Sequence, residues 1–213
     1  MVLVHGTRDR AASFDAVRRG LGDLDVTAYT RRGWATSAGL TPIDLDTHVD
    51  DLVGVLDDRP SVVVGHSWGG LVAIAAAIRR PDLVTGIGIW ETAMLWLPGS
   101  PVGHREHLTD AIERSRRDLT GSADRRSRRI RFVEEASASL VRQFDLHELS
   151  VPCIVGVGGA SSPPLVAALR NIAVTIGAEV VEVPGASHMA HRERPEAFAE
   201  FVRRAVSLAS PDA

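Results

Sequence analysis

A serine between two glycines is the first feature of this sequence that could do chemistry. Residues 61–70 read SVVVGHSWGG, which places Ser67 in a G-x-S-x-G pattern. A serine in that pattern either acts as a nucleophile exposed at a sharp turn or simply fills a tight bend. The pattern is short, and a chain with 19 glycines can contain it by chance, so its surroundings must decide.

Short β-branched stretches alternate with helical patterns along the chain. We expect strands at 2–4, 25–29, 61–65, 84–90, 153–157 and 179–183, and helices near 10–20, 44–58, 68–80, 163–176 and 195–208. The strands are apolar on both faces, which is typical of buried parallel strands. The order predicts an α/β fold with a mostly parallel sheet of about six strands and helices on both faces. Ser67 then lies between a strand and a helix, at the strand ends where such folds bind ligands.

One segment interrupts this alternation. Residues 98–147 carry no strand signal, and their Arg- and Glu-rich pattern predicts two or three amphipathic helices. The segment reads as an insertion, either a helical lid over the site or a solvated helical face without a role there.

Composition limits the class of protein. The 213 residues suit one domain, 1–213, with the insertion inside it. A net charge of −3 without long single-sign runs gives no reason to expect nucleic acid or a membrane as partner, so a small molecule is expected. The single Cys153 excludes an internal disulfide, and no apolar run is long enough for a signal peptide or a membrane span, so a cytoplasmic location is expected. The sequence does not indicate the oligomeric state.

With its strand, turn and helix, the Ser67 segment resembles the nucleophile elbow of the α/β-hydrolase family. VLVHGT at 2–7 is similar to the strand and HG turn of that family, and YTRRGWATS at 29–37 to its Y-D-R-R-G-x-G-x-S loop. Thr30 and Ala35 depart from the latter pattern. The resemblance implies an oxyanion hole formed by the N–H groups of Thr7 and Trp68.

The resemblance covers most of the chain outside 98–147 but begins at the third strand of the usual hydrolase sheet. Either this is a compact form that lacks the first two strands, or the start has been trimmed. The first reading is favoured because Met1 directly precedes VLVHG.

The resemblance also singles out one histidine. VPGASHMAH at 183–191 matches the turn that delivers the catalytic base, so His188 is the expected base and His191 the alternative. His66 is expected to point away into the sheet edge, and His5 to order the oxyanion loop. No H-E-x-x-H or similar spacing supports a metal, and no cofactor is expected.

The acid of the triad is less obvious. Most α/β-hydrolases carry it in a G-x-x-D pattern after the strand that corresponds to 153–157, where this chain has Gly158, Gly159, Ala160 and Ser161. Some members, haloalkane dehalogenases among them, carry the acid one strand earlier. Glu91 stands there, and we hypothesise that it orients His188. The alternatives are that Glu91 caps the segment that follows it or binds substrate, while another acid such as Asp145 completes the triad or the site works as a Ser-His dyad.

These residues predict a serine hydrolase that cleaves an ester-type acyl bond of a small molecule through an acyl-enzyme. A thioesterase or lactonase, a lyase or cyclase, and a ligand-binding protein on the same scaffold are the alternatives. Trp96 and Leu97 are candidates for an apolar acyl pocket, as is Trp68, although each could equally belong to the core.

Overall fold

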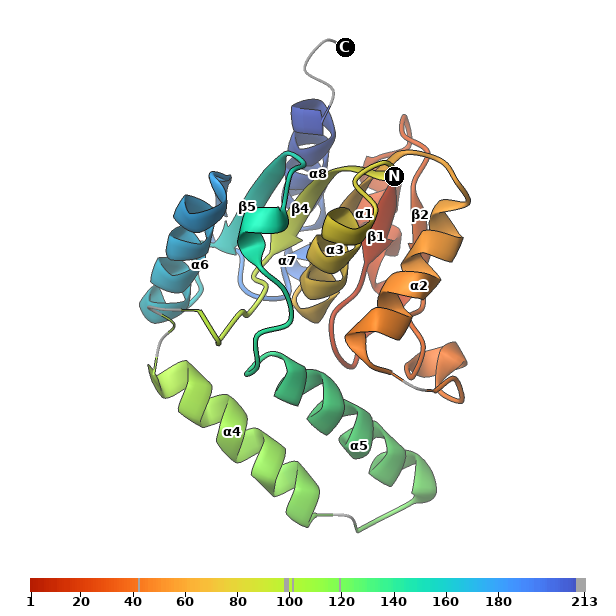
Figure 1. Ribbon diagram of the computed structural model, residues 1–213, viewed down its shortest axis with the longest axis vertical. Coiled ribbons are helices and arrows are strands. Elements are labelled where there is room, and N and C mark those ends of the chain that lie inside the picture. The colour runs from red at the N-terminus through yellow and green to blue at the C-terminus, as the bar shows by residue number, and fades with distance from the viewer. Residues whose placement is uncertain (42, 98–99, 101, 119, 210–213) are drawn as a thin grey trace.

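The chain folds as a parallel sheet covered by helices on both faces (Figure 1). The computed structural model describes residues 1–41, 43–97, 100, 102–118 and 120–209, so a few residues of the predicted domain 1–213 and insertion 98–147 lie outside the described part. The strands are β1 (Val2–Val4), β2 (Thr27–Tyr29), β3 (Ser61–His66), β4 (Val84–Trp90), β5 (Cys153–Gly158) and β6 (Glu179–Val183). The α-helices are α1 (Asp15–Gly20), α2 (Leu45–Leu56), α3 (Trp68–Arg79), α4 (Val102–Arg117), α5 (Ala123–Ala138), α6 (Pro163–Ile176), α7 (Ala190–Glu193) and α8 (Pro195–Ala209). Three short 3₁₀ helices are η1 (Ala11–Phe14), η2 (Ala35–Ser37) and η3 (Leu146–Glu148).

The six predicted strands are confirmed, and they form one sheet in the order β2-β1-β3-β4-β5-β6. Every neighbouring pair is parallel. The predicted helices are also present, with the first divided into η1 and α1. All strands therefore end at the same edge of the sheet, and loops that follow different strands meet there.

Alternate residues of each strand build two cores, one on each face. Val2 and Val4 face the side covered by α2, α3 and α6, whereas Leu3 between them faces α1 and α8. This alternation explains why the strands read as continuous apolar runs, because both of their faces are buried.

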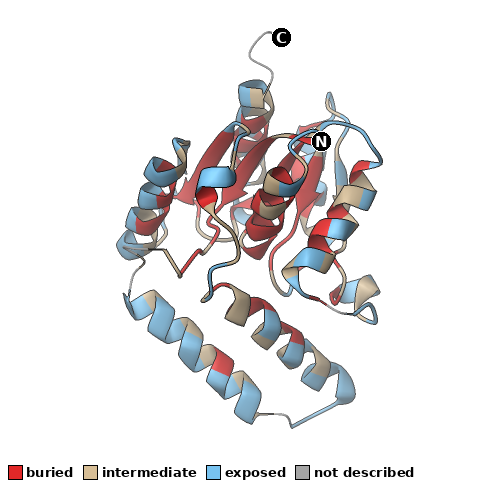
Figure 2. Cartoon of the chain, viewed as in Figure 1, coloured by how far each residue is buried: buried red, intermediate tan, exposed pale blue. Residues whose placement is uncertain are grey.

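Helices α4 and α5, which lie between β4 and η3 in the chain, pack together as a helical hairpin at the strand-end side of the molecule (Figures 1 and 2). Its first helix, α4, is largely exposed, and Ile112 is its buried residue among those described. The second helix, α5, buries Arg131, Glu135 and Ala136 on the side toward the sheet. None of the helices in the described part of the chain combines the length and apolar character needed to cross a bilayer.

The carboxylate of Glu135 attaches α5 to the rest of the fold. Glu135 and Arg31 are both fully buried, and their charged atoms lie 2.6 Å apart. The same carboxylate accepts hydrogen bonds from Thr7 Oγ1 at 2.6 Å and from Trp34 Nε1 at 2.8 Å. The backbone carbonyl of Glu135 accepts a further bond, from Trp68 Nε1 at 2.7 Å. One residue of the hairpin therefore contacts the loops after β1 and β2 and the start of α3.

These contacts keep Glu135 ionised despite its burial. Burial raises the pKa of Glu135, but the charge of Arg31 and the hydrogen bonds from His48, Arg31 and Thr7 lower it by more, to well below its ordinary value. A buried carboxylate with this many donors is stable only while its partners remain in place.

We expect Glu135→Gln to destabilise the fold by about 3–5 kcal/mol, because the buried Arg31 guanidinium would lose its carboxylate partner. Urea unfolding of the two proteins measures the difference. Glu134→Gln is the matched control: Glu134 is the exposed neighbour on the same helix, and its replacement should change stability by less than about 0.5 kcal/mol. Equal effects of the two substitutions would contradict the role given to Glu135.

Candidate active site

Ser67 lies at the turn between β3 and α3, in a backbone conformation that is unusual for a residue with a side chain. Its φ is 54° and its ψ is −124°. The turn is held by two hydrogen bonds, from Ser67 N–H to the Trp90 carbonyl at 2.7 Å and from Gly70 N–H to the Ser67 carbonyl at 2.9 Å. Strain of this kind costs on the order of 1–3 kcal/mol and is concentrated at functional sites.

The glycines around Ser67 allow backbones to pass very close to one another. A Cβ on Gly65 would lie 2.5 Å from the Gly70 Cα, and one on Gly6 would lie 2.9 Å from the Ser67 Cβ. Neither position could hold a side chain without movement of the turn. The glycines of the elbow and of the HG turn are therefore required by packing, and they bring the loop after β1 against Ser67.

Glu91 follows β4 directly and is almost completely buried, with 1% of its surface exposed. Its Oε2 lies 3.1 Å from His188 Nδ1. Its Oε1 accepts bonds from Gly158 N–H at 2.8 Å and from Ser161 Oγ at 2.5 Å. The structure thus brings together Glu91 and His188, which lie 97 positions apart in the chain.

The turn after β5 lacks the usual acid, and its residues bind the carboxylate of Glu91. Gly158 and Ser161, which occupy the usual G-x-x-D pattern, instead donate hydrogen bonds to Glu91. Burial raises the pKa of Glu91, but bonds from His188, Ser161 and Gly158 lower it by more, so the net pKa is below its ordinary value. Glu91 is therefore a carboxylate at neutral pH. Asp145, the alternative acid, caps η3 and pairs with Arg142.

His66 does not point away into the sheet edge as the sequence suggested. It is buried, and its ring lies 4.8 Å from the His188 ring and 4.3 Å from the His191 ring, centroid to centroid. Its Nε2 donates to the His188 carbonyl at 2.8 Å, which ties the His188 backbone to the residue that precedes Ser67. Sequence reasoning missed this role, because nothing in the letters GHS tells which way the histidine ring turns.

His191 and Asp9 continue the series of contacts that begins with His188 and His66. His191 Nε2 lies 3.1 Å from Asp9 Oδ2, and Asp9 also pairs with Arg192. Among the described residues, Asp9, His66 and His191 offer ligand atoms within 4.8 Å of one another and so could hold a metal ion. Both Asp9 oxygens already accept hydrogen bonds from protein groups, so an ion would have to displace them.

The two residues expected to form the oxyanion hole are both tied to Glu135 by their side chains. Thr7 donates through its hydroxyl and Trp68 through its indole, to the carboxylate and the carbonyl of Glu135 respectively. Trp68 is the first residue of α3, so its N–H belongs to the group of amides that lack a partner within a helix.

His5 fixes the course of the loop that carries Thr7. Its Nδ1 donates to the Gly6 carbonyl at 2.7 Å, and its Nε2 accepts from Arg31 N–H at 2.9 Å. Burial and the nearby charge of Arg31 lower the pKa of His5 to about 3, so the ring is neutral. His5 therefore holds the course of the loop after β1, whereas the part of that loop in an oxyanion hole stays a prediction.

Trp96 and Leu97 line a cavity of about 430 Å³ between η3 and α6, together with Phe144. Ser67, Glu91 and His188 are not among the described residues that line it. The assignment of Trp96 and Leu97 to a substrate pocket therefore stays a prediction. Trp68 is 4% exposed and belongs to the core on the α3 face.

The six-stranded parallel sheet with helices on both faces matches the α/β-hydrolase fold. The model of the Alpha/beta hydrolase family matches residues 1–201, and the chain belongs to that family. Among relatives, lipase LipV of Mycobacterium tuberculosis is 32% identical over 105 residues, which is 48% of this chain and 40% of the lipase. Pyrethroid hydrolase of Sphingobium wenxiniae is 29% identical over 132 residues, 53% of this chain and 46% of that enzyme.

The matched part of this chain thus spans less than half the length of these two relatives. Among solved structures, a thermophilic esterase from Thermogutta terrifontis superposes on 98% of this chain and 89% of its own, with a TM-score of 0.75 and 23% identity. At that level of identity the likeness concerns the fold.

Buried neutral histidines around the site predict a loss of stability in mild acid. The pKa of His5, His48 and His66 is lowered, chiefly by burial. Because the unfolded chain binds protons near pH 6.5 and the fold does not, stability is full above that pH and falls as pH decreases toward the folded values. For His5, whose pKa is about 3, the loss at about pH 5 is about 2 kcal/mol.

Urea unfolding at about pH 7.5 and about pH 5 measures this loss, and carboxyl groups contribute little to it above pH 5 because they titrate near pH 4 when unfolded. We expect His5→Gln to show a smaller difference between the two pH values than the native protein. His147→Gln, which replaces an exposed histidine, is the control. A His5→Gln protein with the native difference would contradict the assignment.

Proposed function

We propose that the chain is a serine hydrolase that cleaves an ester-type acyl bond of a small molecule. The observation that supports this best is the contact of 3.1 Å between Glu91 and His188 Nδ1, at the same end of the sheet as the strained turn of Ser67. A carboxylate that holds Nδ1–H leaves Nε2 of the imidazole free to act as a base.

In the proposed reaction, His188 Nε2 removes the proton of Ser67 Oγ as the oxygen attacks the acyl carbonyl. The tetrahedral intermediate then expels the alcohol, which takes the proton from His188 and leaves an ester on Ser67. Water activated by His188 next attacks that ester, releases the acid and returns the proton to Ser67. Glu91 keeps the imidazole in one tautomer and stabilises the imidazolium that forms twice in the cycle.

Negative charge develops on the carbonyl oxygen in both tetrahedral intermediates. We assign its stabilisation to the backbone N–H groups of Thr7 and Trp68. Support comes from the rigidity of both residues, since Glu135 and His5 hold the segments that carry them. Donors that are fixed before the reaction need no reorganisation when the charge appears.

Thioesters and lactones fit the same chemistry, so a thioesterase or lactonase remains an alternative. A lyase or cyclase that uses His188 as a base without a covalent step is a second alternative, because the fold alone does not determine the reaction. We further propose that the hairpin formed by α4 and α5 is a lid and that Trp96 and Leu97 contact the acyl group.

We expect Ser67→Ala to lower kcat for a short p-nitrophenyl ester by at least about a thousandfold, since the acyl-enzyme can no longer form. A fluorophosphonate should label the native protein once per chain and leave Ser67→Ala unlabelled. Ser207→Ala, which replaces an exposed serine of α8, is the control and should keep both properties. Native turnover without Ser67 would contradict the nucleophile, and turnover without labelling would favour the non-covalent alternative.

Replacement of the Glu91 carboxylate tests the triad separately. We expect Glu91→Gln to lower kcat by about 10³- to 10⁴-fold while the protein stays folded, because an amide can stabilise the wrong tautomer of His188 and cannot stabilise its cation. Glu196→Gln, an exposed position in the first turn of α8, serves as the control. Circular dichroism confirms folding, and turnover close to native in the Glu91 variant would exclude it as the triad acid.

A further inference from the structure

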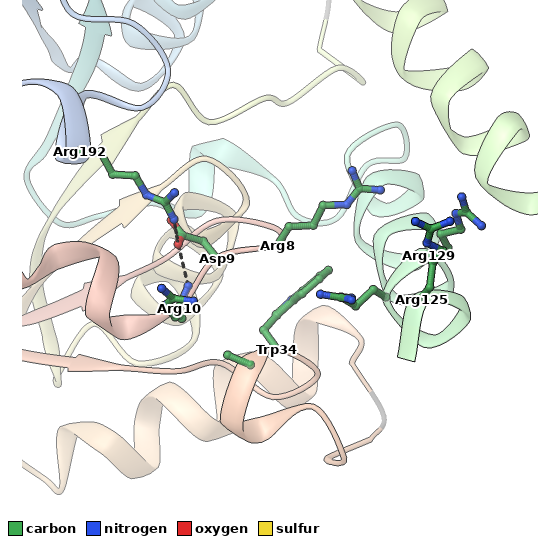
Figure 3. A pocket seen from close by; sticks show the side chains of 9 residues that line it. Arg8, Asp9, Arg10, Trp34, Arg125, Arg129 and Arg192 are labelled. Atoms are coloured by element: carbon green, nitrogen blue, oxygen red, sulfur yellow. Dashed lines mark hydrogen bonds and ion pairs between the residues drawn. The ribbon is translucent and has the colours of Figure 1, made fainter. Parts of the chain in front are cut away.

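A second cavity is lined by residues of the loop after β1, and arginines surround it (Figure 3). Its volume is about 730 Å³. Six of the chain's 24 basic residues line it, namely Arg8, Arg10, Arg125, Arg128, Arg129 and Arg192. Asp9 is the single acidic residue among its described lining.

The arginines reach the cavity from three separate parts of the chain. Arg8 and Arg10 belong to the loop after β1, Arg192 belongs to α7, and the other three belong to α5. Figure 3 shows Arg8 extended toward the arginines of α5, while Arg10 and Arg192 lie beside Asp9. A merely solvated face would place its charges along one helix, whereas these charges converge on one space.

The carboxylates in the described part of the chain pair with half of these six arginines. Arg192 pairs with Asp9, Arg128 with Asp124 at 2.6 Å and Arg129 with Asp118 at 2.5 Å. The remaining three, Arg8, Arg10 and Arg125, form no ion pair with any residue in the described part of the chain.

Like charges in one cavity repel, and Arg8 lies among them. Its guanidinium lies 4.0 Å above the Phe132 ring, and its pKa is lowered chiefly by partial burial and to a smaller extent by the charge of Arg129. Its backbone also has a positive φ of 62°. A bound anion would relieve this repulsion, and guanidinium groups match phosphate and carboxylate oxygens in pairs.

The floor of the cavity connects it to the candidate active site. Asp9 contacts His191, whose ring packs at a tilt against that of His66, the residue before Ser67. Trp34 is buried beneath the arginines and donates to Glu135, the residue that also holds Thr7. Arg8 directly follows Thr7 in the chain. A ligand in this cavity would therefore lie against the same loop that we assign to the oxyanion hole.

We propose that this cavity binds a multiply charged anionic group of the substrate, either a phosphate or a polycarboxylate, while the scissile acyl bond lies at Ser67. The identity of this group as part of the substrate rests on the proposed hydrolase function, whereas the anion site itself does not. Because α5 contributes three of the arginines, the bound anion would also hold the hairpin against the loop after β1.

Binding is tested without turnover, by calorimetry with pyrophosphate, inorganic phosphate and citrate at concentrations up to about 10 mM. We expect saturable binding that weakens as salt is added and that persists in Ser67→Ala. The double variant Arg10→Gln/Arg125→Gln should bind these anions more weakly, with a loss of affinity of at least about tenfold for each arginine removed. Arg116→Gln, an exposed position of the same hairpin that does not line the cavity, should bind like the native protein.

The three probes separate the sources of the anion. Tighter binding of pyrophosphate than of citrate supports a phosphate, and the reverse order supports a polycarboxylate. Binding of none of them, or an equal loss in Arg116→Gln, would overturn the anion site.

The link to the substrate needs a second measurement. Two p-nitrophenyl esters are compared, one whose acyl chain ends in a carboxylate or phosphate and one in which a methyl group replaces it. We expect kcat/KM to favour the anionic ester, and this preference to fall about tenfold in the double variant. Anion binding without any such preference would overturn the assignment to the substrate. Failure to hydrolyse either ester would count against the hydrolase function, while the binding result still decides the anion site.

Discussion

The buried carboxylate of Glu135 is the contact on which the strand-end side of the molecule depends. A charge without access to water is stable only if fixed donors surround it, and Arg31, Thr7 and Trp34 supply them. These donors come from loops that follow β1 and β2, while Glu135 belongs to α5. The requirement to satisfy one anion therefore determines where the helical hairpin meets the sheet and how the loop bearing Thr7 runs.

Backbone strain is concentrated at the same edge. Ser67 and Glu91, which directly follow β3 and β4, both have positive φ, at 54° and 44°. They are also connected through the backbone, since Ser67 N–H bonds to the carbonyl of Trp90. A side chain in this conformation persists only when its surroundings over-determine it. Two such residues stand at adjacent strand ends, and strain of this kind is concentrated at functional sites.

Local signals allowed most of the fold to be predicted, because apolar runs and Gly or Pro boundaries act within a few residues. They could not indicate which charged residues are buried. Glu134 and Glu135 are adjacent and identical in type, yet one is exposed and the other fully buried, and only the approach of Arg31 decides between them. For the same reason the side chains of His66 and Asp9, which pair with distant residues, were missed. Ser67, Glu91 and His188 could be selected since each lies in a motif or directly after a strand.

The turn after β5 shows how the position of one acid constrains its neighbours. With Glu91 buried at the end of β4, a second carboxylate in that turn would place two like charges in one dry site and raise the pKa of at least one of them. Gly158 and Ser161 offer donors there instead, which keep Glu91 ionised. The carboxylate of Glu91 therefore requires that the turn after β5 carry no acid of its own. The two features together describe one arrangement, in which the carboxylate directly follows β4 and two of its hydrogen-bond donors lie at the end of β5 and in the turn after it.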